Sequence, residues 1–381
     1  MPVFHWHLAF PDVFHVPTGN VMPENVQTGW SGGFNVMLGN PPYVFGEHHD
    51  KKMKACFQTA FHVAKGQYNT YWLFIEQALH LINPLGKCAL VVPDALLARD
   101  ETQTIRELLL QKGLREVCDC GTLFEAGVST AIFTVDSKEN SEEILGKALE
   151  GHRALIKNTC SKSRFLADSK HRFLIYMSEE EARILSYIEK NCEPLQNFVK
   201  ISRGEEVGKK GTFSEGMFPI LAGEDISRYV IRKPSRFLHT LQKEFSLYQS
   251  PKIVILKTGH QCIASLEMES AITMQSVYNI HITVPKISYE VLLALLNSNM
   301  VDYYIYKTFT SYKRLFPQLN QSTIESIPVP LEIMARHEKL CELVANIQWL
   351  RENVEVRGRY GSARQKEQIR AIEREINDIV Y

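Results

Sequence analysis

The residues best suited to chemistry form the tetrapeptide Asn40-Pro41-Pro42-Tyr43. The side-chain oxygen of Asn40 and the carbonyl of Pro41 are two hydrogen-bond acceptors, and Tyr43 adds a flat aromatic ring. Each proline lacks an N–H group and fixes its own φ, and it also restrains the residue before it. The pair therefore predicts a stiff loop that holds both acceptors in one direction. Two adjacent acceptors beside an aromatic face suit the exocyclic amino group of a planar base.

The apolar run over residues 34–39 leads directly into this loop. Its length and composition, with Gly32 and Gly33 before it, predict a buried strand of a parallel sheet. The tetrapeptide then lies at the carboxyl end of a strand, which is the edge of an open α/β sheet where ligands bind. The alternative is an ordinary turn, since Pro-Pro pairs are common in turns.

At these residues the sequence resembles the adenine-specific DNA methyltransferases of bacterial restriction–modification systems, of the type II or type IIG kind. That family methylates N6 of adenine with S-adenosylmethionine, after the base has been flipped out of the duplex. The resemblance implies that Asn40, Pro41, Pro42 and Tyr43 are the catalytic residues. The Asn40 side chain and the Pro41 carbonyl would accept hydrogen bonds from the amino group, and Tyr43 would stack on the base. It also implies that methyl transfer needs no metal, while methylation of cytosine N4 stays open.

The resemblance implies three further site residues. Phe124 stands where the family has a second aromatic that stacks on the base, and a place in the core is an equal alternative. Asn69 and Tyr71 stand where the family lines its cofactor pocket together with Asn40, and a helix cap and a core residue are the alternative.

Two histidines near the start of the chain, His5 and His7, alternate as in a strand and could be metal ligands. No third ligand is spaced to join them, so ordinary packing is favoured over a metal site. The eight cysteines are scattered without zinc spacing, which indicates reduced thiols in a cytoplasmic protein. No apolar run reaches the roughly 18 residues of a transmembrane helix, so we expect no membrane contact.

The sequence lacks the usual elements of a cofactor site. A nucleotide-like cofactor on an open α/β sheet needs a glycine-rich turn after the first strand and an acidic residue after the second. The residues before Asn40 contain neither, and no strand with a Gly-x-Gly turn follows Tyr43. We therefore expect that a separate polypeptide carries the cofactor-binding half, and a nuclease is the other protein partner that such systems allow.

Apolar spacing places the tetrapeptide on an α/β framework. It predicts helices over 71–82, 101–112 and 178–191, and strands over 88–92, 116–120 and 131–135. The fold expected for residues 1–190 is a partial Rossmann-like methyltransferase sheet, the carboxyl-terminal part of a catalytic domain.

From residue 193 short strand-like runs alternate with glycines and polar turns, at 218–221, 252–256 and 278–284. Eleven Lys or Arg stand against six Asp or Glu between Lys200 and Lys257, although the formal net charge of the chain is zero. Residues 202–210 and 219–229 resemble the target-recognition domain of the same enzymes, which implies an α+β domain over 191–330 that binds duplex DNA. Its cations would neutralise phosphates. The residues expected to contact DNA are Arg203, Lys209, Lys210, Arg228, Lys257, Lys313 and Arg314.

The last segment, residues 331–381, predicts a C-terminal helical hairpin with helices over 331–354 and 365–380. The function that follows is a site-specific adenine methyltransferase, or its catalytic-loop and specificity portion. A catalytically inactive DNA-binding specificity fragment is the first alternative. An unrelated α/β protein in which the tetrapeptide is only a turn is the second.

Overall fold

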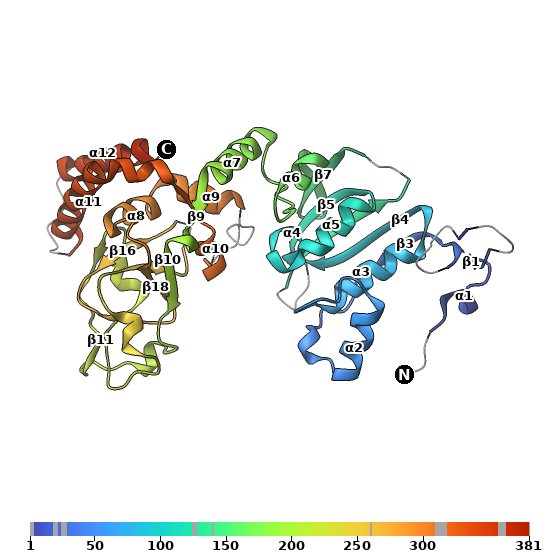
Figure 1. Ribbon diagram of the computed structural model, residues 1–381, viewed down its shortest axis with the longest axis horizontal. Coiled ribbons are helices and arrows are strands. Elements are labelled where there is room, and N and C mark those ends of the chain that lie inside the picture. The colour runs from blue at the N-terminus through green and yellow to red at the C-terminus, as the bar shows by residue number, and fades with distance from the viewer. Residues whose placement is uncertain are drawn as a thin grey trace. The chain divides into compact units, whose positions relative to one another are not determined.

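The computed structural model describes residues 4–17, 22–23, 29–123, 128–138, 141–259, 261–308, 318–356 and 363–380. The chain divides into two compact units, Met1–Arg183 and Ile184–Tyr381 (Figure 1). This division and the expected boundary at residue 190 both fall within helix α7 (Glu179–Asn191).

A six-stranded mixed sheet forms the centre of the first unit, in the order β3-β4-β6-β5-β7-β8. β3 is parallel to β4 and β5 is parallel to β7, while the other neighbours are antiparallel. The strands are β3 (Phe34–Gly39), β4 (Ile82–Pro93), β5 (Leu114–Thr122), β6 (Ser129–Asp136), β7 (Glu143–Glu150) and β8 (Arg153–Ser161). The strands predicted over 88–92, 116–120 and 131–135 are confirmed within β4, β5 and β6. No sequence pattern had indicated β7 and β8.

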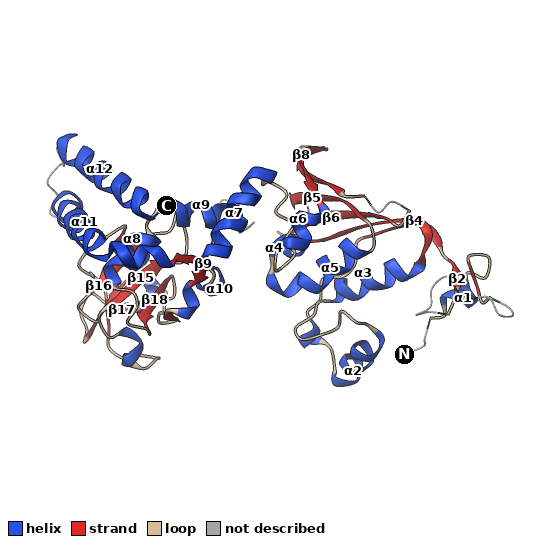
Figure 2. Cartoon of the chain, turned by 45° about the horizontal axis from the view of Figure 1, so that its top comes forward, coloured by secondary structure: helices blue, strands red, loops and turns tan. Residues whose placement is uncertain are grey.

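Helices cover one face of this sheet, as Figure 2 shows. α3 (Thr70–Leu81) and α5 (Gln103–Gln111) share a core with side chains of β4, β5 and β6. Leu90, Val117 and Phe133 of that core are at most 5% exposed. The helices predicted over 71–82, 101–112 and 178–191 are confirmed as α3, α5 and α7. The other helices of this unit are α1 (Trp6–Ala9), α2 (Lys51–Ala60), α4 (Ala95–Ala98) and α6 (Lys162–Ala167).

β3 is the edge strand of the sheet, and the expectation that it is buried was wrong. Met37 packs against the core, but Val36 and Leu38 on the opposite face are 58% and 74% exposed. Among the residues that the structure describes, no strand pairs with the outer edge of β3. β3 therefore has the apolar composition of an interior parallel strand without the neighbours that normally cover one.

The segment before β3 contains α1 and two short strands, β1 (Phe14–His15) and β2 (Ser31–Gly32). The expected strand-like alternation of His5 and His7 was wrong, because Trp6–Ala9 form a helical turn. In the described ranges no group of three or more His, Cys, Asp or Glu is placed to hold a metal.

The second unit contains a four-stranded antiparallel sheet, β10-β18-β15-β16, and a three-stranded sheet, β14-β11-β17. The strands are β9 (Cys192–Pro194), β10 (Val199–Arg203), β11 (Phe218–Leu221), β12 (Ile226–Ser227), β13 (Val230–Ile231), β14 (Phe237–Leu238), β15 (Lys252–Leu256), β16 (Ala264–Glu267), β17 (Ile272–Thr273), β18 (Val277–Ile282) and β19 (Pro328–Pro330). The helices are α8 (Tyr289–Leu296), α9 (Asn299–Thr308), α10 (Gln321–Glu325), α11 (His337–Arg351) and α12 (Ala363–Val380). The three predicted strand-like runs are confirmed as β11, β15 and β18.

The helical C-terminus predicted from the sequence consists of α11 and α12. An ion pair between Arg351 and Glu373 joins the two helices. Both helices belong to the second unit. The predicted fold class is thereby confirmed: a mixed α/β sheet, then an α+β region, then a helical end. None of the helices within the described ranges is long and apolar enough to cross a membrane.

A buried carboxylate fixes the chain between β3 and α3. Glu76 of α3 is 5% exposed, and its two carboxylate oxygens accept hydrogen bonds from the backbone N–H groups of His62, at 3.0 Å, and Val63, at 2.9 Å. These bonds hold residues 62–63 against α3, just before the chain enters that helix.

We predict that Glu76→Gln lowers the free energy of unfolding by about 2 kcal/mol, because an amide can accept from only one of the two N–H groups and turns its own NH₂ toward the other. Urea unfolding followed by tryptophan fluorescence measures the change, since Trp72 is buried in the same core. Glu107→Gln, at an exposed position of α5, is the control and should change stability by less than about 0.5 kcal/mol. An equal loss in both variants would contradict the prediction.

Candidate active site

The Asn40-Pro41-Pro42-Tyr43 loop leaves the sheet at the carboxyl end of β3, where Gly39 is opposite Leu90 of β4. The Tyr43 hydroxyl lies 2.9 Å from the Asn40 side-chain oxygen and 3.0 Å from the Val91 carbonyl oxygen, and it can donate to either. Donation to Val91 ties the loop to β4, and donation to Asn40 fixes the position of the Asn40 amide.

The residues of the loop differ in exposure. Asn40 and Pro42 are exposed, Pro41 is buried and Tyr43 is half-buried. The side-chain oxygen of Asn40 has two lone pairs, so it can accept a second hydrogen bond while Tyr43 donates the first. An incoming amino group can therefore reach an acceptor that is already oriented.

The ring of Tyr43 borders the core and lies edge-on to the ring of Tyr71, with 6.1 Å between centroids. Burial raises the pKa of the Tyr43 hydroxyl above its ordinary value. A tyrosine hydroxyl is protonated at neutral pH even at its ordinary pKa, and the raised pKa extends this range upward, so the group is available as a donor to Asn40 or Val91.

Asn69 and Tyr71, expected to line a cofactor pocket, both have contacts within the fold. Asn69 is the N-cap of α3, and its side-chain oxygen accepts the Tyr71 backbone N–H at 3.4 Å. Tyr71 is 2% exposed, and burial raises its pKa to about 12. Of the three residues expected at the cofactor, only Asn40 is exposed. The cofactor roles of Asn40, Asn69 and Tyr71 stay predictions.

A closed excursion of the chain lies directly after the loop. The carbonyl oxygen of Val44 accepts bonds from the N–H group and the hydroxyl of Thr70, at 2.8 and 2.7 Å, and the Gly46 N–H donates to the Tyr68 carbonyl at 2.8 Å. We call residues 47–67, between these contacts, the α2 excursion. It was not predicted, although Asp50 before the apolar pair Met53 and Phe57 is a helix-start signal.

The cations expected to contact DNA have different surroundings. Lys210 is exposed and Lys257 is half-buried, and the structure gives neither an acidic partner among the described residues. Lys209 pairs with Glu224, and Arg203 donates to the Gln275 carbonyl at 3.1 Å. Phe124, Lys313 and Arg314 lie outside the described residues. Their roles, and those of the other expected contacts, stay predictions.

Arg228 points into the second unit. Its Nε donates to the Cys262 carbonyl at 3.0 Å, and its guanidinium pairs with Asp302 at 2.5 Å. The side chains of this pair are 14% and 16% exposed. Arg228 is therefore bound within the domain in this structure.

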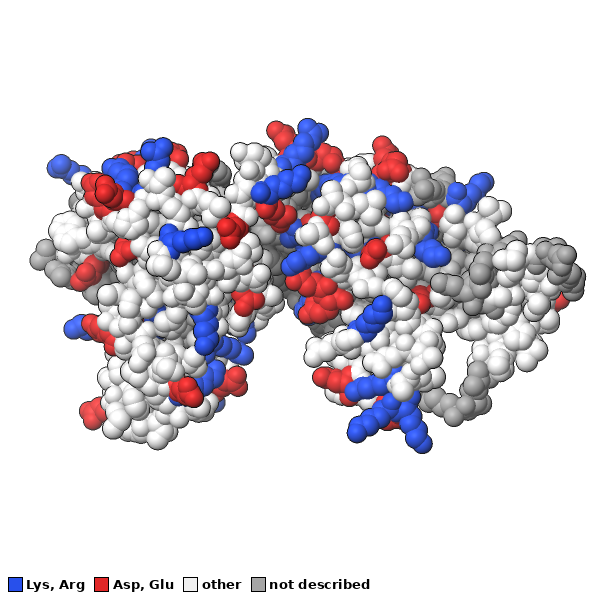
Figure 3. Space-filling model, in the orientation of Figure 1, with Lys and Arg blue, Asp and Glu red and all other residues white. Residues whose placement is uncertain are grey.

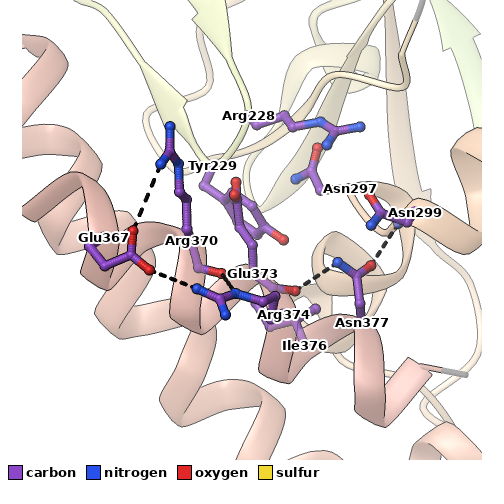
Figure 4. Close-up of a pocket in the computed structure, with 10 residues that line it drawn as sticks. All are labelled: Arg228, Tyr229, Asn297, Asn299, Glu367, Arg370, Glu373, Arg374, Ile376 and Asn377. Atoms are coloured by element: carbon purple, nitrogen blue, oxygen red, sulfur yellow. Dashed lines mark hydrogen bonds and ion pairs between the residues drawn. The ribbon is translucent and has the colours of Figure 1, made fainter.

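A polar pocket of about 400 Å³ lies beside Arg228 (Figure 4). Glu367 in its wall pairs with Arg374 at 2.8 Å and with Arg370 at 3.8 Å. Each arginine of the wall has an acidic partner, since Glu367 pairs with Arg370 and Arg374 and Asp302 pairs with Arg228, and we assign the pocket no function.

We predict that Tyr43→Phe lowers the free energy of unfolding by about 1 kcal/mol, because the ring remains and one hydrogen bond is lost. The raised pKa means that the folded state favours the neutral hydroxyl. Its contribution is complete below the ordinary pKa of 10.0 and is lost as pH rises through the raised value, so the difference should be constant from about pH 6 to 9. Urea unfolding at several pH values measures it. Tyr187→Phe, at a residue that is 70% exposed, should leave stability within about 0.5 kcal/mol of the wild type.

Two family models match separate parts of the chain. Residues 2–124 match the Eco57I restriction-modification methylase. Residues 218–329 match the TaqI-like C-terminal specificity domain. The first match contains the Asn40 loop and the second contains strands β11 to β18.

Individual proteins with similarity to this chain include three restriction-modification proteins. The type II restriction enzyme and methyltransferase RM.Eco57I of Escherichia coli is 28% identical over 79 residues, which are 20% of this chain and 8% of that protein. The type IIL restriction-modification enzyme MmeI, solved in complex with DNA, is 13% identical with a TM-score of 0.57, over 91% of this chain and 53% of that chain. The type IIG restriction endonuclease BpuSI is 13% identical with a TM-score of 0.36, over 91% and 54%.

The likeness to MmeI is one of fold, and the chain spans about half the length of the solved structures it matches. The sequence matches give information on the family that the fold likeness alone does not give. The chain is therefore a relative of the restriction–modification methyltransferases, with a methylase region and a TaqI-like specificity region.

Proposed function

We propose that this chain is the base-binding and DNA-recognition part of a site-specific DNA adenine N6-methyltransferase. The observation that supports it best is the exposed Asn40 amide, oriented by Tyr43 at the carboxyl end of β3. This is the edge of an α/β sheet at which ligands bind. Phe124 and Tyr43 are proposed to stack on a flipped adenine.

In this proposal the chain holds and orients the amino group of the base. The side-chain oxygen of Asn40 accepts one N–H and the carbonyl of Pro41 accepts the other, which turns the nitrogen lone pair to one side. Orientation of a reacting atom can supply a large part of a rate enhancement. Tyr43 keeps the Asn40 oxygen in place through its own hydroxyl.

We propose that S-adenosylmethionine is the methyl donor and that a separate polypeptide holds it. The position of β3 supports the proposal. A strand that leads into a cofactor-binding turn must have its carboxyl end beside Asn40 if the cofactor and the base are to meet. β4 already pairs with one side of β3. A second strand, parallel to β3, would therefore pair with its open outer side.

The specificity region, proposed as residues 191–330, reads duplex DNA in this scheme, and residues 331–381 form the helical hairpin. Positive and negative side chains are mixed over the face of the molecule in Figure 3. Binding would therefore depend on local cations, and Lys210 and Lys257 are the first candidates because neither has an acidic partner among the residues described.

A catalytically inactive specificity fragment is the second candidate function, and the burial of Asn69 and Tyr71, two of the three residues expected at the cofactor, favours it. Calorimetric titration with S-adenosylmethionine separates the two, using the chain alone and then with the polypeptide encoded immediately upstream. Binding in the mixture supports a split methyltransferase. Binding in neither case leaves the specificity fragment.

We predict that Asn40→Ala lowers methyl transfer by the assembled enzyme by about 100-fold or more, because the variant loses an oriented acceptor for the amino group. Mass spectrometry of nucleosides from treated DNA measures the product. Asn35→Ala, on the same strand, is the matched control and should retain transfer. Full activity of Asn40→Ala would mean that the loop is only structural, and N4-methylcytosine as the product would contradict the choice of base.

We predict that Val36→Lys weakens association with the upstream-encoded polypeptide by at least about tenfold, because a docked strand would bury the introduced charge. Biolayer interferometry measures the affinity without requiring activity. Ile156→Lys is the control: it is 59% exposed against 58% for Val36, and it lies on β8 at the opposite edge of the sheet. Equal affinities of the two variants would exclude the β3 edge as the interface.

A further inference from the structure

α2 carries three lysines within its first four residues, Lys51, Lys52 and Lys54, and no acidic residue. Lys51 and Lys52 are exposed, and Figure 3 shows positive side chains gathered over this helix. The Nζ of Lys54 lies 3.4 Å from the carbonyl oxygen of Glu47. Within the described residues none of the three has an acidic partner, so their charge is available to a ligand.

The stability of α2 does not account for these lysines. The N-terminal end of a helix dipole is positive, so cations in the first turn are unfavourable. Asp50, the N-cap, uses a carboxylate oxygen to accept the Met53 N–H at 2.8 Å. Three positive charges at this end of the helix therefore oppose the local electrostatic preference.

The α2 excursion is fixed beside the candidate site at both ends. It begins after the contacts of Val44 and Gly46, which follow Tyr43 almost directly. On the returning part of the excursion, His62 and Val63 donate their N–H groups to Glu76. The chain then enters α3 at its N-cap, Asn69. α2 is therefore held at the same end of the sheet as Asn40.

We propose that Lys51, Lys52 and Lys54 bind phosphate groups of the DNA strand beside the base held at Asn40. The inference rests on the proposed function and adds a second charged contact to DNA, within the methylase unit. A flipped base must be unstacked from its neighbours, and contacts to the adjacent backbone help to hold the strand while this happens.

The other exposed residues of α2 favour DNA over an acidic protein as the ligand. They are Ala55, Cys56, Gln58, Thr59 and Ala60. Protein interfaces depend on large aromatic or arginine anchors, and this surface offers none among them. Side chains without bulky anchors around lysines suit a phosphate backbone, because each lysine acts as a point charge.

The test is the salt dependence of binding to a duplex oligonucleotide of arbitrary sequence, since phosphate contacts do not depend on sequence. For the double variant Lys51→Ala/Lys52→Ala we expect the slope of log affinity against log salt to fall in magnitude by about 2, close to 0.9 for each lost contact. Lys51→Arg/Lys52→Arg keeps both charges and should keep the slope.

The control is Lys112→Ala/Lys138→Ala, which removes the same charge from exposed positions. Lys112 precedes β5 and Lys138 follows β6, and the register of β4, β5 and β6 places both at the sheet end opposite Asn40. Its slope should equal that of the wild type.

The melting temperature distinguishes binding from a structural role. Removing cations from the start of α2 should leave it unchanged or raise it. A wild-type slope in Lys51→Ala/Lys52→Ala would overturn this inference alone. A wild-type chain without salt-dependent DNA binding would overturn the proposed DNA recognition, and this inference with it.

Discussion

The candidate site depends on the hydrogen bonding of one hydroxyl group. The Tyr43 hydroxyl is between the side chain of Asn40 and the carbonyl of Val91, and its one proton can join the loop either to its own first residue or to the neighbouring strand. The prolines restrict the backbone of the loop, but restriction alone does not decide where the Asn40 amide points. Burial raises the pKa of the hydroxyl further above neutral, and the core beneath Tyr43 keeps its ring in place.

The same residues illustrate why a motif has to be read with its surroundings. Asn40 is exposed and Tyr43 is half-buried, whereas Tyr71 lies in the core and Asn69 begins a helix. Asn40 and Tyr43 can meet a ligand, whereas Asn69 and Tyr71 support these two residues. The exposed Asn40 amide beside Tyr43 is thus the part of the loop that the proposed base would meet.

Local elements could be predicted from the sequence because their signals are local. α3, α5, β4 and β6 follow from apolar spacing and from the residues that end each run. The exposure of β3 could not be predicted, since its apolar residues are those of an interior strand and only the arrangement of the sheet shows that one side is open.

β7 could not be predicted for a different reason. Its core-facing positions include Gly146, where a side chain would come within 2.7 Å of Ile175. The strand therefore lacks the alternation of bulky apolar residues that marks a buried strand.

Asn69 and Tyr71 show the limit of resemblance, which can give the position of a residue in a motif but not its exposure. The start of α2 was recognisable from Asp50, which is its N-cap.

The open edge of β3 has a consequence for the amount of working enzyme in a cell. If a second polypeptide completes the sheet, the number of complete catalytic domains follows the law of mass action. Below the dissociation constant, halving the concentration of both chains lowers the number of complexes about fourfold. A sheet divided between two chains would therefore make methylation a second-order function of expression, steeper than that of an enzyme made in one piece.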